Sequence, residues 1–253
     1  MHDHAVRTMT SVDDGSESGR GAVRVPSSRQ CGALESRGGL GDRRSAMLRE
    51  IRFASCYVYT PGYISAASRS LRTSVKKGNV RQLLKRAIQL DAESPQASSF
   101  VRFFPAAAML VPVPGSGRSA WGSATATERL ALALLEQGLG RGIWFGLRRV
   151  RTVRKSATAA PGARPTVKDH YATLTADGID GPGRSDVVLI DDVVTKGRTL
   201  LAAALRLREA LPTADVRAFA LLRTLGYAFD IERYWGPCMG TIEWNGDDAR
   251  RCP

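Results

Sequence analysis

The stretch VVLIDDVVTKGRTLLAAALRLREAL, Val187–Leu211, decides the fold of this chain. It opens with four apolar residues that show no polar alternation, as is typical of a strand buried on both faces of a sheet. Two adjacent aspartates, Asp191 and Asp192, follow this run, and a loop through Val193–Gly197 leads into a helix from Thr199. Two like charges at the tip of a buried strand cost free energy, so we expect them to hold a ligand.

The loop after the aspartates has the features of an anion site. Backbone N–H groups at a helix start lack intrahelical partners, and the helix dipole adds positive potential there. Gly197 lets the backbone approach an anion closely, while Thr195 and Thr199 add hydroxyl donors. Asp191 and Asp192 are suited to accept hydrogen bonds from vicinal hydroxyls such as those of a ribose. The alternative is a bare strand end followed by a capped turn, but both halves together, between a strand and a helix, favour a ligand site.

Strands alternate with amphipathic helices along the rest of the chain. This alternation predicts an α/β fold with a mostly parallel, twisted, Rossmann-like sheet and helices on both faces. In such sheets ligands bind beyond the carboxyl ends of the strands, where the loops after Val113 and Asp191 are expected. The expected strands are IRFASCYVYT (51–60), AAMLVPVP (107–114), IWFGLRRV (143–150), VVLID (187–191) and VRAFALLRT (216–224), and the expected helices are a short one before residue 80, VRQLLKRAIQL (80–90), TATERLALALLEQGLG (125–140) and Thr199–Leu211.

Three segments lack this regular pattern. Residues 1–46 are dense in Gly, Ser, Arg and Asp without a hydrophobic period, which predicts a disordered leader before a domain over residues 47–253. Met47 is then a candidate native start. Residues 151–184 are polar, with three prolines and four glycines, and indicate a long mobile excursion. The end of the chain, through Trp235, Cys238 and Trp244, stays ambiguous.

Composition is that of a soluble globular protein, with 43% apolar and 24% charged residues in a chain of 253. No apolar run approaches the ~20 residues that span a bilayer, and the N-terminus lacks an apolar signal core. We therefore expect a cytoplasmic protein without membrane association. The four cysteines and three histidines form no cluster with metal-ligand spacing.

The net charge of +13 invites a nucleic-acid hypothesis, which the distribution of charge does not favour. Only six of the 37 basic residues are lysines, as expected from a genome rich in G and C. The basic residues are spread along the chain and form no run of five. A polyanionic substrate accounts for part of the excess equally well.

Val187–Leu200 resembles the phosphoribosyl diphosphate (PRPP) binding motif of type I phosphoribosyltransferases, in which two acidic residues precede Thr-x-Gly-x-Thr. The resemblance implies that Asp191 and Asp192 are the catalytic pair and hold the ribose 2′- and 3′-hydroxyls. It implies also that Mg²⁺ binds through PRPP near these two carboxylates. The residues implied to hold the 5′-phosphate are Val193, Val194, Thr195, Lys196, Gly197, Arg198 and Thr199.

A second stretch, LVPVPGSGR at Leu110–Arg118, is similar to a loop in the ComF-like branch of this family. There the loop contacts pyrophosphate through backbone amides and a basic side chain, which implicates Pro114, Gly115, Ser116 and Arg118; a proline-rich connector is the alternative. The family has a flexible hood where this chain has residues 153–174. That hood implies Arg154, Lys155 and Arg164 as candidate pyrophosphate ligands, with His170 and Tyr171 as lesser candidates further out, and a solvated charged loop is equally favoured. ComF-like proteins often carry an N-terminal zinc ribbon, for which this chain has no cysteine set.

The resemblance implies a glycosyltransferase of nucleotide metabolism that uses PRPP and Mg²⁺. It would transfer ribose 5-phosphate to a nitrogenous base or amine and release pyrophosphate. One alternative is a non-catalytic PRPP-sensing or nucleic-acid-binding regulator, for which Arg81, Lys85 and Arg86 would form a basic helix face. Another is a nucleotide hydrolase in a defence system. A homodimer stays open because dimers are common among the relatives, and the motif does not identify the acceptor.

Overall fold

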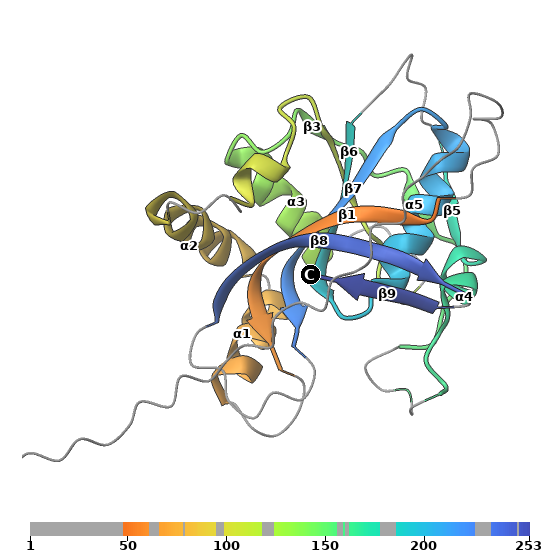
Figure 1. Cartoon of the computed structure of the whole chain (residues 1–253), viewed down its shortest axis with the longest axis horizontal. Coiled ribbons are helices and arrows are strands. Elements are labelled where there is room, and N and C mark those ends of the chain that lie inside the picture. The colour runs from red at the N-terminus through yellow and green to blue at the C-terminus, as the bar shows by residue number, and fades with distance from the viewer. Residues whose placement is uncertain are drawn as a thin grey trace, which may run out of the picture. The chain divides into compact units, whose positions relative to one another are not determined.

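A seven-stranded sheet forms the centre of the computed structural model (Figure 1). The structure describes residues 48–60, 66–77, 79–94, 99–117, 124–155, 159, 162–177, 186–225, 234–246 and 248–253, all within the compact unit Arg37–Pro253. The expected leader, Met47 and Arg118 lie outside these ranges. The strands are β1 (Glu50–Tyr59), β2 (Met109–Pro112), β3 (Gly142–Ile143), β4 (Leu147–Arg149), β5 (Leu174–Ala176), β6 (Asp186–Val194), β7 (Asp215–Thr224), β8 (Trp235–Asn245) and β9 (Asp248–Cys252). The helices are α1 (Ala66–Lys77), α2 (Val80–Glu93), the 3₁₀ helix η1 (Val101–Phe103), α3 (Ala126–Glu136), α4 (Val167–Tyr171) and α5 (Arg198–Ala210).

The strand order of the sheet is β3-β2-β6-β7-β1-β8-β9. The first five strands in this order are parallel to their neighbours. Strand β8 runs antiparallel to β1, and β9 runs antiparallel to β8. Strands β4 and β5 form a separate antiparallel ribbon. The expected α/β fold with a mostly parallel sheet is confirmed, with an antiparallel hairpin added at one edge.

Helices cover both faces of the sheet, and β6 has apolar side chains on both. Val188 and Ile190 pack into a core with α1, α2 and α3, which lie on one side in Figure 1. Val187 and Leu189 point the other way, into a core with α4 and α5. All four side chains are almost wholly buried. Burial on both faces explains why this strand lacks polar alternation.

Two helix starts agree with local sequence signals. Thr125 and Glu128 form a capping box at the start of α3, and Thr166 and Asp169 form another at the start of α4. Each box satisfies backbone N–H groups that a helix start leaves without partners. No helix in the described ranges is long and apolar enough to cross a bilayer.

Three expectations need correction. Strand β6 does not end at Asp191 but continues to Val194, because its pairing with β7 extends to Val194 opposite Arg223. The segment 143–150 is not one strand: β3 ends at Ile143, and the chain continues as β4, which pairs with β5 outside the main sheet. Gly146 lies between the two strands and packs closely against Asp177, since a β-carbon there would lie 2.3 Å from the Asp177 carbonyl oxygen.

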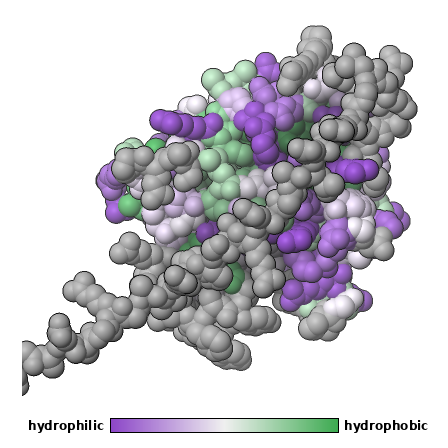
Figure 2. Space-filling model, viewed as in Figure 1, coloured by the Kyte–Doolittle hydropathy of each residue, from purple (hydrophilic) through white to green (hydrophobic). Residues whose placement is uncertain are grey.

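The third correction concerns the polar excursion, which contains α4 and β5. Val167 and Leu174 anchor these elements in the core around α5. The ambiguous C-terminal stretch forms the β8–β9 hairpin, and hydrophilic side chains gather over β9 on the face shown in Figure 2.

Candidate functional site

A cavity of about 340 Å³ lies at the carboxyl ends of three parallel strands. Tyr59 ends β1, Thr224 ends β7, and Asp191–Val194 end β6, so one edge of the sheet supplies its floor. The location agrees with the rule that ligands of open α/β sheets bind beyond the carboxyl strand ends. The lining residues are Tyr59, Arg72, Lys76, Arg164, His170, Thr224 and the continuous segment Asp191–Leu200.

The two aspartates have different surroundings. The Asp192 side chain is 10% exposed and forms an ion pair with Lys76 Nζ, near the end of α1. Asp191 accepts a hydrogen bond from the Asp192 backbone N–H at 2.8 Å. Burial and then the neighbouring Asp192 carboxylate raise the pKa of Asp191 to about 8. Two carboxyl groups thus lie side by side at the cavity floor, and at pH 7 the raised pKa keeps Asp191 largely protonated while Lys76 pairs with Asp192.

The loop after β6 has the geometry of an anion cradle. Gly197 is the N-cap of α5 and has a φ of 86°, in the left-handed region that favours glycine. Gly197 has no side chain to cap this helix start, which leaves its first backbone N–H groups suited to bind an anion. A β-carbon at residue 197 would lie 2.6 Å from Ile242 Cγ2, which packs β8 directly against the loop. Gly197 is therefore required by conformation and by space.

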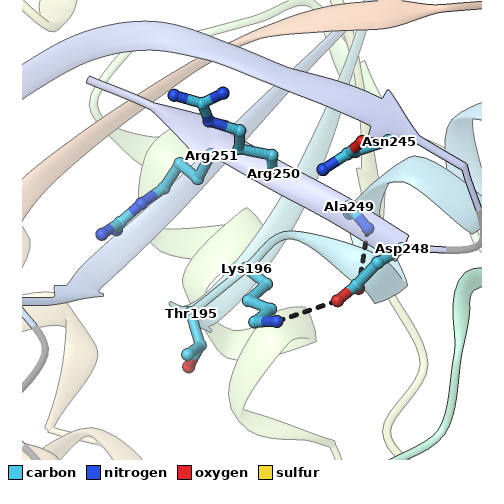
Figure 3. A pocket seen from close by; sticks show the side chains of 7 residues that line it. All are labelled: Thr195, Lys196, Asn245, Asp248, Ala249, Arg250 and Arg251. Carbon is cyan, nitrogen blue, oxygen red and sulfur yellow. Dashed lines mark hydrogen bonds and ion pairs between the residues drawn. The ribbon is translucent and has the colours of Figure 1, made fainter. Parts of the chain in front are cut away.

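The two basic side chains of the loop point to β9. Lys196 Nζ lies 2.8 Å from Asp248 Oδ2, as Figure 3 shows. Arg198 donates to both oxygens of Asp248 and, through Nη1, to the Pro165 carbonyl at 3.0 Å. The Arg198 hydrogen bond holds the pKa of Asp248 well below its usual range. Arg198 thus contributes its backbone to the predicted phosphate site, while its side chain connects the loop to the hairpin and the hood.

A second cavity, of about 280 Å³, is lined by residues of this loop and of the β8–β9 hairpin, whose side chains Figure 3 shows. Thr195 and Lys196 line both cavities. Arg250 and Arg251 leave β9 in different directions. Arg251 donates to the Thr224 carbonyl at 2.5 Å and to the Val194 carbonyl at 3.5 Å, which ties β9 to the ends of β7 and β6.

The structure places only some of the predicted pyrophosphate residues at the main cavity. Arg164 lines the main cavity, whereas Lys155 is exposed and does not. Gly115 and Ser116 lie in the loop after β2, next to β6, because Val113 N donates to the Ile190 carbonyl at 2.9 Å. Pro114, Gly115 and Ser116 do not line the cavity itself.

Arg149 is a site residue that sequence reasoning missed. It is 1% exposed, and its Nε donates to the Gly115 carbonyl at 2.5 Å. It also donates to Thr173 Oγ1. Burial lowers the pKa of Arg149 to about 10, and the nearby Asp191 carboxylate opposes that shift. This arginine holds the loop after β2 through the Gly115 carbonyl, and its place among other arginines gave no sign of burial.

His170, ranked among the lesser candidates, lies inside the site. It is 4% exposed and lines the cavity, with Nε2 at 3.4 Å from Thr199 Oγ1. Its Nδ1 has no hydrogen-bond partner in the described part of the chain. Burial, and then Arg149, lower the pKa of His170 to about 4, so the imidazole is neutral at pH 7.

The residues of the site fit a metal that is held largely by its ligand. Within the described ranges, no three His, Cys, Asp or Glu side chains group closely enough to hold a metal ion. Asp191 and Asp192 supply two carboxylates at one edge of the cavity. Mg²⁺ is commonly bound by one or two carboxylates together with substrate phosphates, and this donor set suits that arrangement.

No protein-family model matches the chain, and a search of curated proteins finds no match.

Proposed function

We propose that this protein is a phosphoribosyltransferase that transfers ribose 5-phosphate from PRPP to a nitrogenous base or amine and releases pyrophosphate. The observation that carries the proposal is the meeting of an aspartate pair and an uncapped, glycine-started helix in one cavity. The two features together suit one sugar phosphate: carboxyl groups accept from vicinal hydroxyls, and the helix start binds the phosphate.

Each part of the cavity then has a task in binding PRPP. The backbone N–H groups from Thr195 to Thr199 hold the 5′-phosphate, with the two threonine hydroxyls as further donors. Asp191 and Asp192 hold the ribose hydroxyls, and Lys76 keeps the Asp192 carboxylate in place. When bound, Mg²⁺ would offset the charge that builds on the leaving pyrophosphate.

The pyrophosphate would lie towards β2. The loop at Pro114–Ser116 lies beside β6, and Arg149 connects its Gly115 carbonyl to the surroundings of Asp191. Arg164 enters the cavity from the hood and is the described hood cation best placed to contact this ligand. Arg118 and the remaining hood residues would complete the site.

Catalysis on this arrangement is mainly positioning and charge stabilisation. The bond between C1′ and the pyrophosphate oxygen loosens, and positive charge develops on the sugar. The carboxyl groups of Asp191 and Asp192 hold the sugar, and the ionised carboxylate of Asp192 offsets that charge. A nitrogen nucleophile attacks the opposite face, so the reaction proceeds with inversion, and no protein nucleophile is required.

Two alternatives use the same cavity. A PRPP sensor that binds nucleic acid would use the basic side chains of α2, of which Arg81 pairs with Glu136 at 2.5 Å and Arg86 donates to Gln89 at 2.9 Å. A hydrolase would cleave a nucleotide with water as the acceptor. Neither has an observation that favours it over transfer.

The test is a pyrophosphate-release assay with PRPP, Mg²⁺ and a panel of bases and amines. Transfer requires release that depends on one of the acceptors. Release without any acceptor would indicate hydrolysis, and PRPP binding without release under any condition would indicate a sensor. For the nucleic-acid alternative, an affinity that does not fall steeply with salt would argue against phosphate contacts.

A further inference from the structure

One end of the main cavity is not used by the PRPP motif. It is formed by Tyr59 at the end of β1, Thr224 at the end of β7, and Arg72 on α1, and we call it the β1 end. Tyr59 and Thr224 are paired neighbours in the sheet, and Leu225 N donates to the Tyr59 carbonyl at 3.0 Å. Both side chains are largely buried. The β1 end is therefore a wall of the cavity formed by buried residues that pair in the sheet.

Helix α1 is fixed above this wall. The Thr60 backbone N–H donates to Ser68 Oγ at 3.0 Å, and Ser68 is 1% exposed. Arg72 lies one helical turn further on, with its guanidinium carbon 5.9 Å from the centroid of the Tyr59 ring. Lys76, another turn along, reaches Asp192. The helix thus presents two cations in a row along the cavity, and only the second reaches the aspartates.

Among the described residues, two cations of the cavity, Arg72 and Arg164, have no acidic partner. Lys76 pairs with Asp192, and Lys196 and Arg198 pair with Asp248. No ion pair joins Arg72 to a carboxylate in the described part of the chain, where its guanidinium contacts the Tyr59 ring. A guanidinium that lies over an aromatic ring keeps its N–H donors available for a planar anion.

The side from which the nucleophile attacks C1′ decides which substrate contacts Arg72. Nucleophile and leaving group must approach C1′ from opposite sides. The loop for the leaving pyrophosphate follows β2, which neighbours β6 on one side. Strand β7 neighbours β6 on the other side, and β1 lies beyond it, about 10 Å from β6 at the usual strand spacing. The nucleophile therefore belongs at the β1 end.

We propose that the acceptor is a small nitrogen heterocycle or aromatic amine that carries a carboxylate, and that Arg72 binds this carboxylate at the β1 end of the cavity. The inference rests on the proposed function. In the transfer, the acceptor nitrogen forms a bond to C1′, and the C1′–O bond breaks with its electron pair leaving on pyrophosphate. A proton on the acceptor nitrogen, where there is one, passes to solvent.

The experiment compares acceptors that differ only by the acid group. Orotate is assayed against uracil, nicotinate against nicotinamide, and 2-aminobenzoate against aniline, each with PRPP, Mg²⁺ and the full-length chain. We expect at least one acid to release pyrophosphate with a kcat/KM about 10- to 100-fold above that of its neutral partner, the range for one charge-assisted hydrogen-bond pair.

Variants of Arg72 identify the residue responsible. Arg72→Met keeps the aliphatic stem, so it should raise the KM for the acid about 10- to 100-fold and leave the dissociation constant of PRPP unchanged. Arg72→Lys keeps the charge and should restore part of the loss. Arg102→Met removes an exposed charge from η1, outside the cavity lining, and should behave like the wild type.

Different outcomes overturn different claims. A wild-type chain that binds no PRPP refutes the proposed function, and this inference with it. If PRPP binds but the neutral acceptors react as well as the acids, or no acid reacts, the inference alone is wrong. It is also wrong if Arg72→Met weakens PRPP binding and spares the acceptor, since Arg72 would then belong to the donor site.

Discussion

Gly197 offers a sharp test of the site geometry because a β-carbon at this residue would cause both backbone strain and overpacking. Its φ of 86° is a conformation that costs a residue with a β-carbon about 1–2 kcal/mol. In addition, a β-carbon there would lie 2.6, 2.7 and 2.9 Å from three side-chain carbons of Ile242, and overpacking of this kind costs about 1–3 kcal/mol. Gly197→Ala should therefore lower the free energy of unfolding by about 2–5 kcal/mol.

Urea denaturation measures this loss, and a second glycine separates the two costs. Gly138 has a φ of 74°, and a β-carbon there would meet no described atom within 4 Å, so Gly138→Ala should lose only the conformational part, about 1–2 kcal/mol. Ile242→Ala removes the opposing carbons. In a double-mutant cycle, its combination with Gly197→Ala should cost about 1–3 kcal/mol less than the sum of the single variants.

The reasoning is refuted if Gly197→Ala is no more destabilising than Gly138→Ala, or if it shows no coupling to Ile242→Ala. Either result would mean that β8 does not pack against the phosphate loop as described. Calorimetry adds a functional readout: a displaced loop should weaken PRPP binding in Gly197→Ala and leave it unchanged in Gly138→Ala.

Three further predictions follow from charges in the site. Asp248→Asn should lower the free energy of unfolding by about 1–2 kcal/mol, and because the pKa of Asp248 is depressed, this difference should fade below about pH 4. The pKa of His170 is lowered to about 4, so the unfolded chain binds the proton more readily than the folded chain. The free energy of unfolding should therefore fall by about 2–3 kcal/mol from pH 7 to pH 4, and His170→Gln should flatten that dependence. The pKa of Asp191 is raised to about 8, so ionisation of this carboxyl group opposes folding at high pH. Asp191→Asn should therefore raise the free energy of unfolding at pH 9 by about 1–3 kcal/mol, while it weakens PRPP binding.

Denaturation curves recorded across pH check all three. Asp177→Asn is the control for Asp248, because Asp177 forms an ion pair of which both side chains are about half exposed, and its loss should cost less than about 1 kcal/mol. A His170→Gln variant with the wild-type pH profile would show that the histidine is not buried in its neutral form. An Asp191→Asn variant that is less stable than the wild type at pH 9 would contradict the raised pKa.

Elements with strong local patterns could be predicted from the sequence. Strand β6 and helix α5 follow from an uninterrupted apolar run and a helical period, and the Thr125 capping box signals the start of α3. The β8–β9 hairpin could not be read this way. Strand β8 contains Gly236, Pro237 and Gly240, which disfavour strands, and it forms because β1 offers an edge to pair with.

The same distinction holds for the site. The motif residues are contiguous, so their shared cavity was predictable. The partners that hold them are remote in sequence: Lys76 is 116 residues from Asp192, and Asp248 is 50 residues from Arg198. Arg149 sits among other arginines, and only the fold distinguishes a buried arginine from an exposed one. Long-range ion pairs of this kind leave no local pattern.

The central claim is that Asp191, Asp192 and the loop to Thr199 bind PRPP. Isothermal titration calorimetry with PRPP and Mg²⁺ measures this directly on the full-length chain. We expect one site per chain, with affinity at least about tenfold weaker in Asp191→Asn and Asp192→Asn, since each change replaces a carboxyl oxygen with an amide NH2 that cannot accept a hydrogen bond. Asp215→Asn, at the opposite end of β7, should bind like the wild type. Absence of binding, or equal binding by all the variants, would contradict the account.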